Sequence, residues 1–218
     1  PIIILIKLYI MVKLYDYLFK LIFTGDVGTG KTTILHKLSN TKYPSVPTIG
    51  VDYAAFYHKI DKIDNEKIKD GNIKCQVWDT AGQEKFAPII RSYYANVAAA
   101  IIVYDVTEHS TFGKIDYWYN DLINNINHDI PVIIVGNKTD QKYKRVITTE
   151  EGKRKADDLN CLFFETNKED DSASLMINCL LKNVYKNKDE IKQGIRNGDE
   201  ILKDLADYDK NRGCCCIC

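Results

Sequence analysis

The chain has 218 residues, enough for one α/β domain with a sizeable core and a tail, and too few for two full-sized domains. Basic and acidic residues number 30 each, and the lack of a basic stripe in the sequence argues against nucleic-acid binding. Four of the seven cysteines stand in the last five positions, which fits neither a disulfide framework nor a zinc site and indicates a reducing compartment.

The first fourteen residues differ from those that follow. Residues 1–10 are apolar apart from one lysine, too few to span a membrane, and they lack the basic leader and cleavage site of a signal peptide. We therefore interpret residues 1–14 as an N-terminal extension, in which the residues ahead of Met11 are an addition to the native chain. An N-terminal helix or an added strand is the alternative.

A glycine-rich motif comes next, between an expected strand (Leu18–Thr24) and an expected helix (Lys31–Ser39). Residues 25–33 read Gly-Asp-Val-Gly-Thr-Gly-Lys-Thr-Thr. A loop of this kind turns backbone N–H groups and the positive end of the helix dipole toward one point, and so binds phosphates. We expect Lys31 to reach the outer phosphates and the Thr32 hydroxyl to coordinate Mg²⁺. A chance glycine turn is the alternative.

A second motif ends the strand expected at Asn72–Asp79, which is preceded by a strand expected at Val51–Ile60. The motif reads Asp-Thr-Ala-Gly-Gln-Glu, starting at Asp79. This order puts the Asp79 carboxylate near the metal, the flexible Gly82 near the terminal phosphate, and the Gln83 amide where it orients a water. In isolation such a string is more often an ordinary loop.

A third motif, Asn-Lys-Thr-Asp at 137–140, follows the strand expected at Pro131–Gly136. The Asp140 carboxylate can accept two N–H donors from the edge of guanine, whereas adenine presents no matching pair, and such polar pairing discriminates by about 10⁴-fold. Open α/β sheets bind ligands at the carboxyl ends of their strands, so the three motifs together predict a guanine-nucleotide site.

The rest of the pattern alternates strands and helices. Further elements are strands at Ala98–Tyr104 and Cys161–Glu165 and helices at Ile90–Asn96, Thr111–Asn127, Thr149–Leu159 and Ala173–Lys186. This order implies right-handed parallel crossovers with one antiparallel strand, and hence a six-stranded, mostly parallel α/β sheet with helices on both faces. On one face of the last helix the pattern places Met176, Cys179, Leu180 and Val184.

Beyond the last helix the apolar density falls, Gly194 and Gly198 interrupt any helix, and charged residues dominate. This composition predicts a flexible tail over residues 188–218. From Lys186 to Gly213 seven Lys or Arg stand against seven Asp or Glu, so this part of the chain supplies no net attraction to anionic lipid.

From Tyr15 onward the chain resembles a small GTPase of the Ras superfamily, and within it a Rab protein. The resemblance is carried by the phosphate loop, the terminal cysteines and the runs Tyr15-Asp16-Tyr17-Leu18-Phe19-Lys20-Leu21, Thr48-Ile49-Gly50-Val51-Asp52-Tyr53, Trp78-Asp79-Thr80-Ala81-Gly82-Gln83-Glu84, Ser92-Tyr93-Tyr94, Asn137-Lys138-Thr139-Asp140 and Phe164-Glu165-Thr166. It implies a Ras-like G domain over residues 15–187 that hydrolyses GTP to GDP and that, in the GTP state, recruits effectors in vesicle-mediated membrane traffic.

The resemblance also implies a role for each motif residue. Gln83 positions the hydrolytic water, and Tyr43 stacks on guanine. Thr48, the first-switch threonine, joins Thr32 and Asp79 as a Mg²⁺ ligand in the GTP state. The implied nucleotide-binding residues are Asp26, Val27, Gly28, Thr29, Gly30, Lys31, Thr32, Thr33, Tyr43, Thr48, Gly82, Asn137, Lys138, Asp140, Thr166, Asn167 and Lys168.

The same resemblance implies surfaces for partners and membrane. Tyr53, Trp78 and Tyr93 match the aromatic triad that meets effectors, although partly buried aromatics also fit a purely structural role. Cys216 and Cys218 match a double-prenylation ending, and two lipids are needed because one gives only marginal binding. A C-a-a-X box over the last four residues and a redox- or metal-reactive cluster are the alternatives.

The implied partners are an exchange factor, a GTPase-activating protein, effectors, a prenylation escort and a GDP-dissociation inhibitor. The implied molecule is a monomer that cycles between the cytosol and the cytoplasmic face of an endomembrane.

The sequence departs from the Rab pattern in several places. Val27 stands where Ras proteins usually have glycine and Rab proteins often have serine. Its branched side chain points toward the γ-phosphate and Gln83, which predicts slow intrinsic hydrolysis. The first switch is shorter than usual, and residues 61–71 form an insertion at a hairpin tip. Asn167-Lys168-Glu169 replaces the usual Ser-Ala-Lys, so the contact expected to change is stacking on the base.

Two other functions fit parts of the sequence. The Gly-Thr-Gly-Lys-Thr-Thr run and residues 78–86 also resemble Ran, the nuclear-transport GTPase, whose tail is acidic and free of cysteine. The other possibility is a scaffold that holds GTP without hydrolysing it, which single-turnover hydrolysis would separate from a working enzyme.

Overall fold

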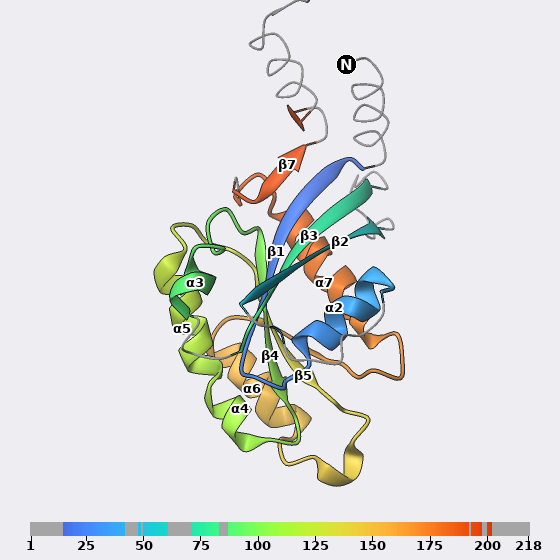
Figure 1. The fold of residues 1–218 in the computed structure, drawn as a ribbon, viewed down its shortest axis with the longest axis vertical. Coiled ribbons are helices and arrows are strands. Elements are labelled where there is room, and N and C mark those ends of the chain that lie inside the picture. Colours follow the sequence, from blue (N-terminus) through green and yellow to red (C-terminus); the bar gives the residue numbers. More distant parts are fainter. Residues whose placement is uncertain are drawn as a thin grey trace, which may run out of the picture.

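The structure is a computed structural model that describes residues 15–41, 48, 50–60, 71–82, 87–191, 193–197 and 200–201. Its central sheet has the strand order β2-β3-β1-β4-β5-β6, and β7 pairs with β1 outside this order (Figure 1). The strands are β1 (Tyr17–Thr24), β2 (Val51–Ile60), β3 (Gly71–Thr80), β4 (Ala99–Asp105), β5 (Val132–Asn137), β6 (Leu162–Glu165) and β7 (Ile195–Asn197). The helices are α2 (Lys31–Ser39), α3 (Ala87–Arg91), α4 (His109–Gly113), α5 (Ile115–Asn125), α6 (Thr149–Asp158) and α7 (Ser172–Lys186), with a 3₁₀ turn, η2, at Lys142–Lys144.

Helices cover both faces of the sheet (Figure 1). On one face, Leu35 of α2 and Leu180 of α7 join side chains of β1 and β3 in one buried cluster. On the other face, Ile90 of α3, Trp118 of α5 and Ala156 of α6 pack against β4 and β5. Burial of these apolar side chains is the main favourable term that holds the layers together.

The burial of each strand follows its place in the sheet. Every residue of β4 and β5 is buried, as expected of parallel strands with helices on both faces, and both strands are nearly continuous apolar runs. At the edge, β2 pairs antiparallel with β3 and leaves most of its side chains at least partly exposed. The six predicted strands and the single antiparallel one among them are confirmed, each boundary to within one residue.

The helix predictions hold less closely. The helix predicted at Thr111–Asn127 is two helices, α4 and α5, because Gly113 favours a break in a helix. The helix predicted at Ile90–Asn96 ends at Arg91, and turns follow it up to Asn96, whose φ is 56°. In the part of the chain that the structure describes, no helix combines the length and the apolar character needed to cross a bilayer.

Two further predictions need correction. Cys179 is exposed, because the buried stripe of α7 runs through Ile177 and Leu181 instead. The prediction of a flexible tail from residue 188 does not hold for its first part, since Ile191 is buried and residues 195–197 form β7, antiparallel to β1. A strand of one apolar and two polar residues has too weak a pattern to be recognised in a sequence.

Candidate nucleotide-binding site

The phosphate loop closes around Lys31, the first residue of α2. The Lys31 ammonium donates hydrogen bonds to the carbonyl oxygens of Gly25 and Asp26, each at 2.8 Å. Burial lowers the pKa of Lys31 to about 8, against the raising effect of the Asp79 and Asp26 charges. The side chain therefore stands inside the curled backbone of the loop, where a phosphate-binding lysine is required.

Gly30 caps α2 and brings the phosphate loop against the third motif. Its backbone is left-handed, with φ 94°, and a Cβ there would collide with Asn137 Nδ2. Asn137 donates to the Thr29 carbonyl at 2.8 Å and accepts from Thr166 Oγ1 at 3.1 Å. Asn137 thus ties the loop to the ends of β5 and β6, and any side chain at residue 30 would break this tie.

Side chains of the loop fix its outer rim. Asp26 Oδ1 accepts the Val27 amide at 2.9 Å, and the buried Thr29 hydroxyl donates to the Asp26 carbonyl at 3.0 Å. Lys114, at the junction of α4 and α5, lies 3.4 Å from Asp26 Oδ2. The Val27 side chain, by contrast, is 48% exposed. The conformation of the loop is therefore set by contacts within the protein, and valine stands on its outer surface.

Three side chains from separate segments converge beside the phosphate loop. Thr32 Oγ1 lies 2.8 Å from Thr48 Oγ1, Thr48 donates to Asp79 Oδ2 at 3.3 Å, and Thr32 also donates to Asp79 Oδ2. Burial raises the pKa of the Asp79 carboxyl, and the Thr32 hydroxyl and the Lys31 charge partly offset this effect. Asp79 Oδ1 is buried without a hydrogen-bond partner among the described residues. A buried carboxylate with one oxygen to spare and two adjacent hydroxyls fits the oxygen ligands that Mg²⁺ prefers.

The segment after β3 lies directly on the phosphate loop. A Cβ at Gly82 would collide with the backbone of Asp26 and Val27, so only glycine allows this approach. The Ala81 amide donates to the Gly50 carbonyl at 2.7 Å, which links the segment after β3 to the segment before β2. Outside the described residues lie Tyr43, Gln83, Cys216 and Cys218.

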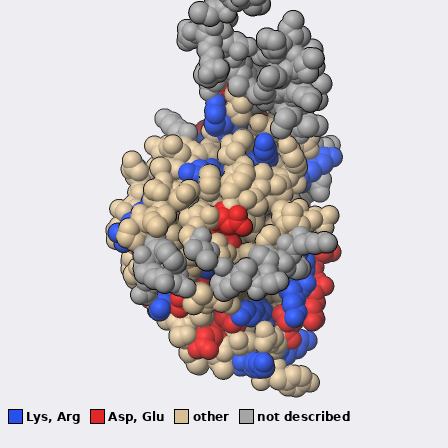
Figure 2. Space-filling view, in the orientation of Figure 1, with Lys and Arg blue, Asp and Glu red and all other residues tan. Residues whose placement is uncertain are grey.

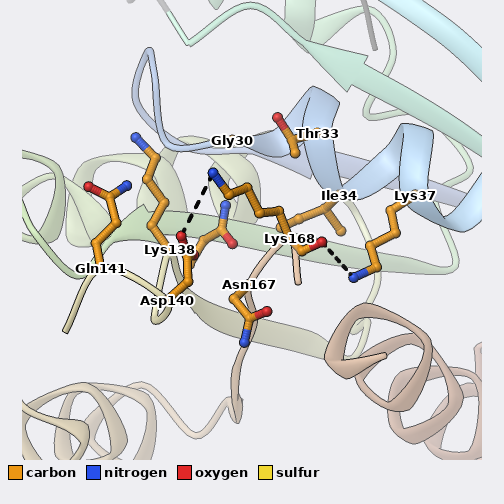
Figure 3. Close-up of a pocket in the computed structure, with 10 residues that line it drawn as sticks. Gly30, Thr33, Ile34, Lys37, Lys138, Asp140, Gln141, Asn167 and Lys168 are labelled. Atoms are coloured by element: carbon orange, nitrogen blue, oxygen red, sulfur yellow. Dashed lines mark hydrogen bonds and ion pairs between the residues drawn. The ribbon is translucent and has the colours of Figure 1, made fainter. Parts of the chain in front are cut away.

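A pocket of about 220 Å³ lies between α2 and the loops that follow β5 and β6 (Figure 3). It is lined by Gly30, Thr33, Ile34, Lys37, Asn137, Lys138, Asp140, Gln141, Asn167 and Lys168. The Asp140 side chain is 9% exposed, and the Lys168 ammonium reaches across the pocket to 4.0 Å from Asp140 Oδ2 (Figure 3). A carboxylate placed here can pair with two N–H donors of a base that enters the pocket.

Two of the contacts that hold the walls of this pocket were missed by sequence reasoning. The Lys138 ammonium lies 2.6 Å from Asp105 Oδ2 at the end of β4. Lys138 therefore lines the pocket with the aliphatic part of its side chain rather than with its ammonium group. Lys37 donates from α2 to the Lys168 carbonyl at 3.1 Å. Lys37 follows Gly30 by seven residues and so lies on the same face of α2, the one sequence signal that could have found it.

The three aromatics predicted to meet effectors lie in a row, with each ring tilted against the next. Their ring centroids are 4.9 Å apart for Tyr53 and Trp78 and 5.0 Å apart for Trp78 and Tyr93. Tyr53 is 45% exposed, whereas Trp78 and Tyr93 are partly buried. The row therefore presents one aromatic edge to solvent and packs the rest against the domain.

Surface charge is mixed in sign. On the face seen in Figure 2, basic and acidic side chains are interspersed over the lower part, and much of the middle is uncharged. This face thus offers no single-signed field to steer a charged partner.

The architecture and the site together define a P-loop nucleotide-binding protein, in which the phosphate loop, the cluster of Thr32, Thr48 and Asp79, and the pocket beside Asp140 lie at the carboxyl ends of β1, β3 and β5. Residues 20–186 match the Ras family, and the chain belongs to this family of small GTPases.

Similar curated proteins place the chain among the Rab proteins. It is 38% identical over 154 residues to Ras-related protein Rab11B of Nicotiana tabacum, which covers 70% of this chain and 67% of that protein. It is 40% identical over 154 residues to RABA1i of Arabidopsis thaliana, with the same coverage. Against RABA1b of Arabidopsis thaliana it is 34% identical over 218 residues, which covers 92% and 95% of the two chains. The chain is thus a Rab-type GTPase of membrane traffic, which confirms the predicted family and favours Rab over Ran.

Proposed function

We propose that the two states of this Rab switch are set at Thr48, and that the site described above holds guanine nucleotide with Mg²⁺. The observation that carries the proposal is the convergence of Thr32, Thr48 and Asp79 beside the phosphate loop. Thr48 reaches this cluster through a single hydroxyl, so the presence or loss of a γ-phosphate can hold or release the first switch. Amide hydrogen exchange around Thr48 with a GTP analogue and with GDP tests this, and equal protection in the two states would contradict it.

Each part of the site has its own task. Lys31 and the backbone N–H groups of the loop hold the phosphates, and Asp140 selects guanine. Thr32, Thr48 and Asp79 would hold Mg²⁺, which would supply positive charge to offset that of the phosphates. The other proposed nucleotide contacts come from Asp26, Val27, Gly28, Thr29, Gly30, Thr33, Tyr43, Gly82, Asn137, Lys138, Thr166, Asn167 and Lys168.

Intrinsic hydrolysis is slow under this proposal. Gly82, at the start of the second switch (the segment that follows β3), lies against the backbone of Asp26 and Val27, and Val27 is exposed. Gln83 follows directly in the chain, and its amide must align an attacking water with the γ-phosphate. A β-branched side chain at this place crowds that alignment, on which phosphoryl transfer depends.

Single-turnover GTP hydrolysis by four proteins tests the crowding: native, Val27→Gly, Gln83→Leu and the double variant. We expect Val27→Gly to raise the rate by up to about 100-fold. GTP affinity should change little, because the backbone N–H groups that hold the phosphates remain. Gln83→Leu should lower the rate more visibly in the Val27→Gly background than in the native one. No acceleration on removal of the valine side chain would refute the crowding, and no hydrolysis even with an activating protein would favour the scaffold alternative.

The membrane anchor is proposed from the sequence of the tail. Prenyl groups on Cys216 and Cys218 would attach the protein to the cytoplasmic face of an endomembrane, since the tail has no net charge to do so. An exchange factor, an activating protein, effectors, a prenylation escort and a GDP-dissociation inhibitor would act on the monomer. Replacing both cysteines by serine should make the protein cytosolic and leave nucleotide binding intact. Membrane retention would shift the anchor to Cys214, Cys215 or the N-terminal extension.

A further inference from the structure

Strand β4 pairs with only part of the edge of β1 that faces it. On this edge β4 pairs with residues 21–24, and β7 pairs antiparallel with residues 17–19. Lys20 joins the two: its amide donates to the Gly194 carbonyl at 2.8 Å, and its carbonyl accepts from the Ala98 amide at 2.8 Å. The chain's own C-terminal segment thus continues the sheet where β4 has not yet begun (Figure 1).

The turn into β7 fits this position closely. Gly194 has φ 74°, and a Cβ there would collide with the backbone of residues 96–98, just ahead of β4. Only glycine therefore lets the chain pass this close to the start of β4. On either side of the glycine, Ile191 is 4% exposed within the cluster under α7, and Ile195 packs against the same cluster. The glycine and the two isoleucines specify where the segment docks.

We propose that the edge of β1 beside the start of β4 is a strand-binding site, and that its occupant is residues 194–197 of the same chain. Main-chain pairing at a sheet edge accepts many sequences, so the glycine and the flanking isoleucines supply the selectivity. A strand of three residues is short, so the docked segment can leave and return. Docking fixes the point at which the tail leaves the domain: the start of β1, opposite the phosphate loop (Figure 1).

The docking contacts do not involve the nucleotide site, and only their consequence for the membrane rests on the proposed lipid anchor. With β7 docked, residues 198–218 span at most about 70 Å when extended and about 25 Å as a relaxed coil. Without docking, the free segment starts at the end of α7 and gains residues 187–197. A lipid-anchored domain is therefore held closer to the membrane when β7 is docked than when it is free. The tail then leaves the domain at the end of the sheet that is remote from the nucleotide site.

Backbone hydrogen exchange on the full-length protein tests the docking, with two matched variants at residue 196. Arg196→Pro removes the backbone N–H in the middle of β7, whereas Arg196→Ala removes only the side chain. Lys20 and Gly194 form a hydrogen-bonded pair, so the next such pair along the two strands is Leu18 and Arg196. The amides of Leu18 and Lys20, which face β7, should therefore be protected in the native protein and in Arg196→Ala. They should exchange at least about tenfold faster in Arg196→Pro. Gly194→Val should give the same loss through its collision with residues 96–98.

Nucleotide affinity should be unchanged in all these proteins, so a failure of the guanine site and a failure of docking appear in different measurements. Unprotected Leu18 and Lys20 amides in the native protein would overturn the proposal, as would equal protection in the proline and alanine variants. Protection that falls on dilution would assign the strand to a second copy of the chain and would overturn docking within one chain.

Discussion

The two ends of the sheet are built in different ways. At the nucleotide end, which comprises the carboxyl ends of β1, β3, β5 and β6, each functional group comes from a motif whose spacing fixes its geometry. At the tail end, which comprises the start of β1 with β7, a short segment uses an edge that the rest of the fold leaves open. Local motifs therefore predict the structure of the nucleotide end, whereas the structure of the tail end depends on tertiary context.

Changing Asp140 is the strongest test of the nucleotide end. Asp140→Asn replaces one acceptor by a donor, so the side chain no longer matches the two N–H donors of guanine and matches xanthine instead. The preference for GDP over xanthosine diphosphate should fall by on the order of 10⁴-fold. Competition against a fluorescent nucleotide measures this, with β7 amide protection as the control for the tail end. If the guanine preference survives, Asp140 does not read the base.

Leu180→Ala tests whether the two ends share one core. Leu180 is fully buried in the cluster that packs α7 against β1, the strand that connects the two ends. Its truncation should lower the free energy of unfolding by about 2–5 kcal/mol. We expect the thermal transition to shift as a whole, with the GDP affinity of the folded protein unchanged. Two separate transitions would mean that the ends unfold independently.

Lys168→Ala should have the smallest effect of the three substitutions, and it acts on nucleotide affinity alone. The Lys168 ammonium, on a side chain that is 65% exposed, lies 4.0 Å from Asp140 Oδ2, and guanine must displace it. An exposed ion pair contributes about 0.2–1 kcal/mol, so GDP affinity should rise by up to about fivefold. Equilibrium titration measures this, and Lys168→Arg, which keeps the charge, is the control. A weaker affinity in the alanine variant would instead mean that the Lys168 side chain, and not only its backbone N–H, contributes a contact to the nucleotide.

Much of the nucleotide end could be predicted because local sequence decides it. Helix α2 runs from Lys31 to Ser39 as predicted, since the phosphate-loop glycines leave the helix one place to begin. Thr32 and Asp79 meet because the phosphate loop brings the start of α2 to the edge of the sheet where β1 and its parallel neighbour β3 both end. The apolar runs of β4 and β5 are strands in the structure because helices bury both of their faces.

Pairings between distant segments could not be predicted in this way. The Lys138 ammonium pairs with Asp105, and the Lys114 ammonium pairs with Asp26. No local spacing in the sequence predicts either ion pair. The same holds for β7, whose pairing depends on how late β4 begins along β1. These contacts form only once the fold is assembled, because it is the fold that brings the distant segments together.

An equilibrium titration of the full-length protein with GDP and with ADP, both with Mg²⁺, tests the central claim most directly: that the nucleotide end is a guanine-specific site. We predict that GDP binds on the order of 10⁴-fold more tightly than ADP, because adenine offers no pair of donors to the Asp140 carboxylate. Equal affinities for the two nucleotides would contradict it.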